Sequence, residues 1–164
     1  MAKRILVPIV SNVTADYSRA VISAARIARK TGSVIRLACL MPLPPPRLDH
    51  QDRVVSDIER EMDRLAAQAE TRLRAMTAEM EGVPVETVIR FGRPRVELRR
   101  EVEVFEPDLV ALATPLASGA GSRLRAWLLR RAAIASKVPV ALLPLPMAAA
   151  GARSSGPMVA PALR

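Results

Sequence analysis

Aromatic side chains are almost absent from this chain. Only 2% of its 164 residues are Phe, Trp or Tyr, although half of all residues are hydrophobic. The core must therefore be aliphatic, which is typical of helices packed on a sheet. Single-stranded nucleic acid is bound largely by stacking bases on aromatic rings. We therefore do not expect nucleic acid as a partner, in spite of the formal charge of +9, because the arginines are also interleaved with acidic residues.

Cysteine and histidine each occur once. Cys39 has no partner for an internal disulfide and lies in the apolar run VIRLACLM, so we expect a buried, reduced thiol. His50 lies in a proline-flanked segment without a neighbouring thiol, which argues against a metal site or a nucleophile–histidine pair. The sequence predicts no catalytic residue.

Long hydrophobic runs are missing as well. The N-terminal run RILVPIV is too short for a signal segment and lacks a small-residue cleavage site. The run near the other end, VPVALLPLPMAAAGA, is interrupted by prolines and is too short to span a bilayer. We therefore expect a cytoplasmic protein that does not insert into membranes.

Short apolar runs alternate with helical patterns along the chain. The runs predict strands at residues 4–10, 33–41, 83–91, 108–114 and 138–145. The helical patterns cover residues of about 14–31, 52–81, 94–106 and 122–136. This alternation predicts an α/β fold, a single doubly wound parallel sheet of five strands with helices on both faces. We expect this domain to span residues 1–146, with a flexible Ala-, Gly-, Ser- and Pro-rich tail over 147–164.

Local signals indicate helix ends and buried faces. Thr14 is a candidate N-cap, Gly32 a stop signal, and Pro94 suits the first position of a helix. Residues at alternating spacings of four and three predict the buried stripe of the second helix: Ile58, Met62, Leu65, Ala69, Leu73, Met76 and Met80. The buried face of the third helix is predicted at Leu98, Val102 and Phe105.

Two turns at the carboxyl edge of the predicted sheet are the natural place for a ligand, because ligands bind there where the strand order reverses. VSN, residues 10–12, follows the first strand, and TPLASGAGS, residues 114–122, leads from the fourth strand into a helix whose free N–H groups favour an anion. Gly119 and Arg123 fit a phosphate-binding turn, but a lone G-x-G is a weak signal. Ser118 and Ser122 are as readily explained as helix caps.

Several segments together resemble the universal stress protein family. They are RILVPIVSN, SRAVISAARIARKTGSVIRLACLMPLP, FGRP, FEPDLVALAT and KVPVALLP, in this order between about Lys3 and Pro144. The resemblance implies a Rossmann-like sheet of order 3-2-1-4-5, of the adenine nucleotide alpha hydrolase-like kind. It also implies a homodimer formed through the last strand, here Val138–Leu145, which as an exposed apolar edge calls for pairing or shielding.

Nucleotide-binding members of that family carry G-x-x-G-x9-G-[ST] after the fourth strand and an aspartate, which contacts adenine, at the end of the first. Placed on that pattern, Ala113 and Leu116 fall on the first two glycines, and Trp127 falls on the final Ser or Thr. The aspartate position falls on Val10. Leu116 is harder to fit than glycine close to a phosphate. The Trp127 ring would fill the place of a small hydroxyl, although simple packing of the ring explains it at least as well.

The resemblance therefore implies a degenerate nucleotide pocket. Its candidate residues are Pro8, Ile9, Val10, Ser11, Asn12, Leu40, Ala113, Thr114, Ser118, Gly119, Arg123 and Trp127. We expect no tight cofactor, with ATP or another adenine nucleotide as the alternative.

Three function classes follow. The favoured one is a dimeric regulatory or interaction module of the universal stress protein kind, not an enzyme, with an unidentified regulatory protein as partner. The second is a nucleotide-binding stress sensor with a variant phosphate loop, in which Asn12 replaces a lost polar contact and at most slow ATP hydrolysis occurs, by resemblance. The third is a basic adaptor that binds nucleic acid or another anionic partner.

Overall fold

The computed structural model describes residues 3–10, 17–45, 58–115, 131 and 137–145. The elements in chain order are β1 (Arg4–Val10), α1 (Ser18–Thr31), β2 (Val34–Met41), α2 (Ile58–Ala78), β3 (Val85–Phe91), α3 (Pro94–Phe105), β4 (Leu109–Pro115) and β5 (Val140–Leu145). The strands form one parallel sheet of order β3-β2-β1-β4-β5, as predicted. The predicted fourth helix and the tail lie almost wholly outside the described residues.

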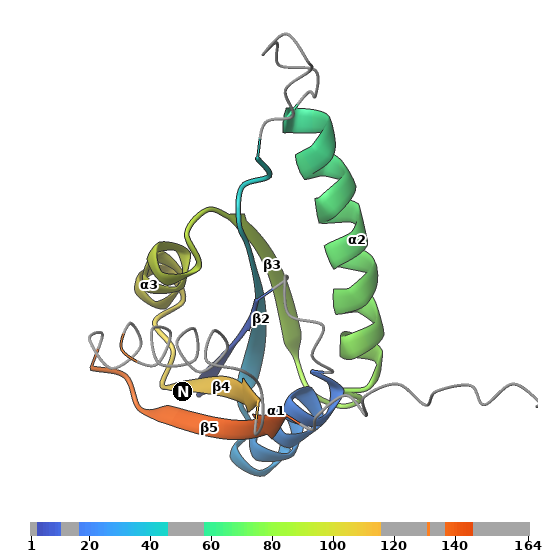
Figure 1. Cartoon of the computed structure of the whole chain (residues 1–164). Helices are drawn as coiled ribbons and strands as arrows, with labels where there is room; N and C mark the ends of the chain where they lie inside the picture. The colour runs from blue at the N-terminus through green and yellow to red at the C-terminus, as the bar shows by residue number, and fades with distance from the viewer. Residues whose placement is uncertain (1–2, 11–16, 46–57, 116–130, 132–136, 146–164) are drawn as a thin grey trace, which may run out of the picture.

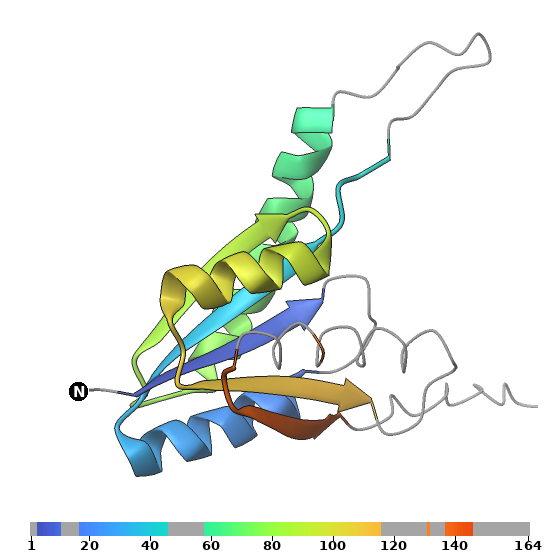
Figure 2. The same cartoon turned by 90° about the vertical axis from the view of Figure 1, so that its left-hand side faces the viewer.

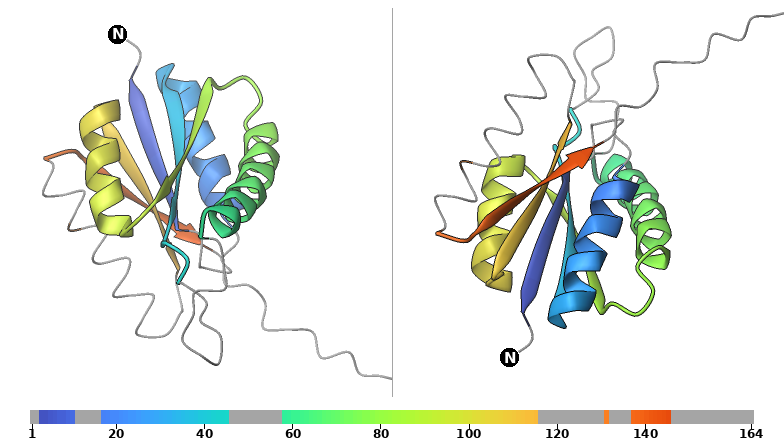
Figure 3. Two further views of the ribbon diagram at one scale, coloured as in Figure 1. Left: turned by 90° about the horizontal axis from the view of Figure 1, so that it is seen from above. Right: turned by 90° about the horizontal axis from the view of Figure 1, so that it is seen from below.

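Three layers are visible in Figures 1 and 3: α1 and α2 cover one face of the sheet and α3 covers the other. Side chains along β1 alternate between the two faces of the sheet. Ile5, Val7 and Ile9 belong to the core cluster under α1 and α2, whereas Leu6 belongs to the cluster under α3. Both clusters are almost wholly aliphatic, as the composition predicts. Cys39 is buried in the α1–α2 cluster, and burial raises the pKa of its thiol to about 11.

The ends of the helices follow the predicted signals. Gly32 adopts a φ of 64° and its N–H donates to Ala28 O, which closes α1. Pro94 occupies the first turn of α3, and the predicted face of Leu98, Val102 and Phe105 is buried. Thr14, the predicted N-cap of α1, lies outside the described residues.

The predicted stripe of α2 is only partly buried. Ala69, Leu73 and Met80 are buried, but Ile58 is 38% exposed, so its assignment to the core was wrong. The N-terminal turns of α2 project past the end of β3 (Figure 1), where none of the described strands lies beneath them. A helical period identifies the side of the helix that faces the sheet, but the length of the sheet decides how far along the helix that side is covered.

A buried carboxylate fastens α3 to the sheet. The Glu101 side chain is fully buried; its Oε1 accepts a hydrogen bond from Arg36 Nη1 of β2 at 2.7 Å, and its Oε2 accepts one from Arg90 Nε of β3 at 3.0 Å. Arg36 also binds Glu86 at 2.6 Å and stacks on the ring of Phe105, 4.1 Å from its centroid. The glutamates beside it raise the pKa of Arg36 in spite of its desolvation.

Candidate functional site

The carboxyl edge of the sheet brings the predicted ligand residues of β1 and β2 together. Val10 and Leu40 are register partners at the ends of these strands. β1 and β4 pair only over Ile5–Leu109 and Leu6–Val110, and Figure 2 shows the two strands diverging toward their carboxyl ends. This is the switch point, where a parallel sheet of this order binds ligands.

Described side chains at the switch point are apolar. Val10 is 6% exposed, Leu40 is fully buried in the α3-side core, and Ala113 of β4 is half-buried. Ile9 packs under α1, so only its main chain is left to a ligand. None of these side chains offers a hydrogen bond to an adenine, a ribose or a phosphate.

Tyr17 closes the end of β1. Its hydroxyl accepts a hydrogen bond from Val10 N–H at 3.3 Å, and burial raises the pKa of this hydroxyl. The helical pattern of the sequence places Tyr17 within the first helical segment and predicts no role for it. The signal available was that it is the single tyrosine of the chain, seven residues after Val10. This contact gives the main-chain N–H at the end of β1 a hydrogen-bond partner within the protein.

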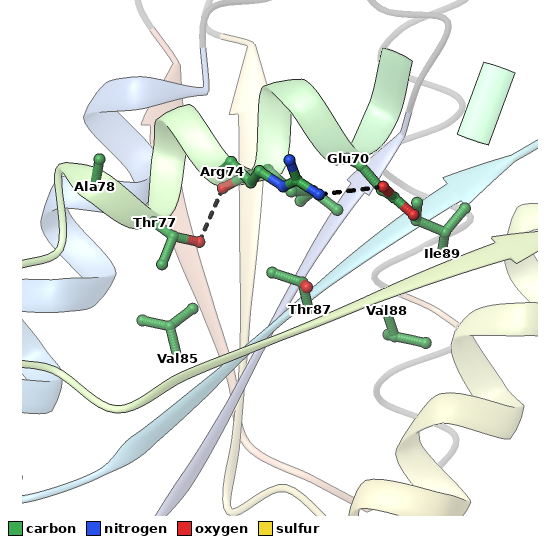
Figure 4. Close-up of a pocket in the computed structure, with 9 residues that line it drawn as sticks. Glu70, Arg74, Thr77, Ala78, Val85, Thr87, Val88 and Ile89 are labelled. Carbon is green, nitrogen blue, oxygen red and sulfur yellow. Dashed lines mark hydrogen bonds and ion pairs between the residues drawn. The ribbon is translucent and has the colours of Figure 1, made fainter. Parts of the chain in front are cut away.

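A second concave surface lies on the opposite side of the molecule from β5. Figure 4 shows this groove between α2 and β3, and its volume is about 760 Å³. Its lining residues are Glu70, Leu73, Arg74, Thr77, Ala78, Val85, Thr87, Val88 and Ile89. No pattern in the sequence predicts this groove, because the groove depends on how far α2 stands from the edge of the sheet.

The sequence and the fold agree with those of known proteins. A sequence model of the universal stress protein family matches residues 1–144. The chain belongs to the universal stress protein family. No curated protein matches it.

Solved structures of other universal stress proteins share this fold. The protein from Burkholderia pseudomallei is 18% identical with a TM-score of 0.61, over 87% of this chain and 96% of that one. UspA from Lactobacillus plantarum is 18% identical with a TM-score of 0.63, over 87% and 97%. The protein from Archaeoglobus fulgidus in complex with dAMP is 14% identical with a TM-score of 0.56, over 86% and 97%. At these identities the likeness shows the fold.

The predicted pocket of this universal stress protein is described in part. Six of its candidates lie on described strands: Pro8, Ile9, Val10, Leu40, Ala113 and Thr114. The other six lie outside the described residues: Ser11, Asn12, Ser118, Gly119, Arg123 and Trp127. The variant phosphate loop therefore stays a prediction.

Two features are absent from the described part of the chain. None of the helices there is long and apolar enough to cross a membrane. No cluster of three His, Cys, Asp or Glu side chains there has the arrangement of a metal site.

Proposed function

We propose that this universal stress protein is a regulatory or interaction module that binds adenine nucleotides weakly. The observation that carries the proposal is the end of β1, where the buried side chain of Val10 occupies the position that the family resemblance gives to an adenine-contacting aspartate. Tyr17 already engages the Val10 N–H. An adenine edge placed against this apolar surface would lose its hydrogen-bond partner, which costs roughly 1–3 kcal/mol and therefore about ten- to a hundredfold in affinity.

Calorimetric titration with ATP and magnesium tests this proposal. We expect no measurable heat or a millimolar dissociation constant, and no nucleotide released when the purified protein is denatured. Micromolar binding near one site per chain would contradict it. In that case Gly119→Val should weaken the binding if the predicted loop holds the phosphates.

The nucleotide sensor is the second candidate, since three solved relatives are described with dAMP, cAMP or AMP bound. Main-chain N–H groups bind phosphate whatever the side chains are. A stoichiometric micromolar site in the titration would favour this function. No described residue suggests itself as a base for ATP hydrolysis, and we propose no enzymatic activity.

We also propose that the module is a homodimer through β5. This strand lies at one end of the sheet, and Leu142 on it is 48% exposed beside the buried Leu143. An apolar edge strand favours pairing with a second edge. Leu142→Glu is expected to remove the contact through β5 and therefore to lower the mass measured by sedimentation relative to wild type. An unchanged mass would contradict the role of β5.

A further inference from the structure

The sheet has a second open edge at β3. Two hydrogen bonds fix which main-chain groups of β3 face β2: Ile35 N–H donates to Pro84 O at 2.9 Å, and Gly92 N–H donates to Met41 O at 2.8 Å. In a parallel pair, alternate residues face the neighbouring strand. The main-chain groups of the intervening residues therefore point to the open edge. These residues are Val85, Thr87, Ile89 and Phe91.

The charges on β3 are complementary to those of a second, antiparallel β3. When the two strands are centred on Val88, Glu86 lies opposite the partner's Arg90, and Arg90 lies opposite the partner's Glu86. The same register pairs Thr87 with the partner's Ile89, whose outward main-chain groups match. Moving the register by two residues in either direction places one of the charges opposite Val88 instead. The charges therefore select the register centred on Val88.

Both charged side chains retain unused atoms. Glu86 binds Arg36 through Oε2 alone, and Arg90 binds Glu101 through Nε and Nη2. Within the described part of the chain, Glu86 Oε1 and Arg90 Nη1 have no partner. The side chains are 50% and 37% exposed, respectively, so a second strand can reach them.

The charges on α2, which lies above the groove, are complementary to those of a second α2 about the same position of β3. In Figure 4, Arg74 lies above Thr87 and Glu70 lies near Ile89, so the point midway between the two charged side chains lies above the stretch from Thr87 to Ile89, whose central residue is Val88. A two-fold axis there brings each Glu70 toward the partner's Arg74. The two side chains are exposed, and their internal ion pair is loose at 3.6 Å.

We propose that the groove between α2 and β3 is an interface with a second copy of the chain, in which the two β3 strands pair antiparallel about Val88. Strand and helix are self-complementary about one axis, as an isologous contact requires. This interface lies at the end of the sheet opposite β5, so the two contacts are independent of each other. A chain that pairs with other copies through both β3 and β5 would form a sheet that continues from one chain to the next.

Two charge variants of α2 test the pairing in a Leu142→Glu background, which removes the contact through β5 both from the variants and from the chain with wild-type α2. Glu70→Arg alone and Arg74→Glu alone each place like charges across the axis, so we expect each variant to associate roughly tenfold more weakly than the chain with wild-type α2. An equal mixture of the two variants restores both opposite-charge contacts and is expected to form the mixed dimer with the affinity of the chain with wild-type α2. Sedimentation equilibrium measures all three. A mixture that associates no better than either variant alone would overturn the proposal.

A Leu142→Glu background separates this interface from the one through β5. In that background the chain is expected to remain a dimer, and Thr87→Pro is expected to make it monomeric. Proline at position 87 removes an N–H that faces the open edge, so no bond to β2 is lost; Thr87→Val is the matched control that keeps this N–H. A Leu142→Glu chain that is monomeric up to millimolar concentration would overturn the β3 interface and leave the proposed function standing.

Discussion

Glu101→Gln is expected to lower the free energy of unfolding by about 3 kcal/mol, because it removes the single anion shared by two arginines. The Glu101 side chain is fully buried, and both of its oxygens accept hydrogen bonds, from Arg36 at 2.7 Å and from Arg90 at 3.0 Å. The side-chain amide of Gln at this position has one acceptor oxygen, and its NH₂ group would face the guanidinium group of one of the two arginines, which is also a donor. Arg36 is only 22% exposed, so it cannot move fully into water to compensate.

Urea-induced unfolding measures this loss, and Glu103→Gln is the control. Glu103 lies on the same helix but is exposed, so its substitution should change the free energy by less than about 0.5 kcal/mol. Adding Arg36→Met to both wild type and Glu101→Gln completes a double-mutant cycle, in which we expect a coupling of roughly 1–3 kcal/mol. Equal effects of Glu101→Gln and Glu103→Gln would show that the buried network contributes no stability.

Gly92→Ala is expected to cost about 2–3 kcal/mol, because strain and a steric contact act together. Gly92 has a φ of 151°, which side chains rarely adopt, and its N–H donates to Met41 O at 2.8 Å. A Cβ there would lie 2.8 Å from Glu97 Oε1 and 3.1 Å from its Cγ. The Glu97 side chain is 9% exposed and binds Arg100 at 3.3 Å, so the whole side chain has to move.

Gly82 supplies the matched control for the backbone strain. Its φ is 74°, and a Cβ there meets nothing within 4 Å, so Gly82→Ala should cost about 1 kcal/mol from the backbone alone. In a Glu97→Ala background the cost of Gly92→Ala should fall toward that value. Denaturant unfolding of Gly92→Ala, Gly82→Ala, Glu97→Ala and the Gly92→Ala, Glu97→Ala double variant measures these free energies. If Gly92→Ala costs as much in the Glu97→Ala background as in wild type, the contact with Glu97 is ruled out.

The partial burial of α2 shows where sequence periodicity stops being informative. The stripe from Ile58 to Met80 correctly identified the side of the helix that faces the sheet, and Leu73 and Met80 are buried. Ile58 is exposed because α2 begins beyond the end of β3 (Figure 1). Periodicity depends on residues within a few turns, whereas the extent of burial depends on a strand that follows later in the chain.

Tyr17 shows the same limit at the candidate site. The apolar end of β1 was evident from the sequence, because Val10 closes an uninterrupted apolar run. The hydrogen bond from the Val10 N–H to the Tyr17 hydroxyl was not evident, because Tyr17 belongs to the next helical segment. Its role depends on how α1 packs back against the sheet, which no local pattern specifies.

Local patterns in the sequence account for the alternation of strands and helices along the chain, the aliphatic core and the apolar end of β1 at Val10. Each of these follows from the hydrophobicity of neighbouring residues and from helix-ending signals such as Gly32. The burial of Glu101, on a helix rich in charges, follows from contacts that are distant in the sequence, since its partners Arg36 and Arg90 stand 65 and 11 residues away. The tertiary structure likewise created the groove beside β3. A charged side chain is buried only where distant residues neutralise it, and a groove exists only where two elements are held apart by the packing of the rest.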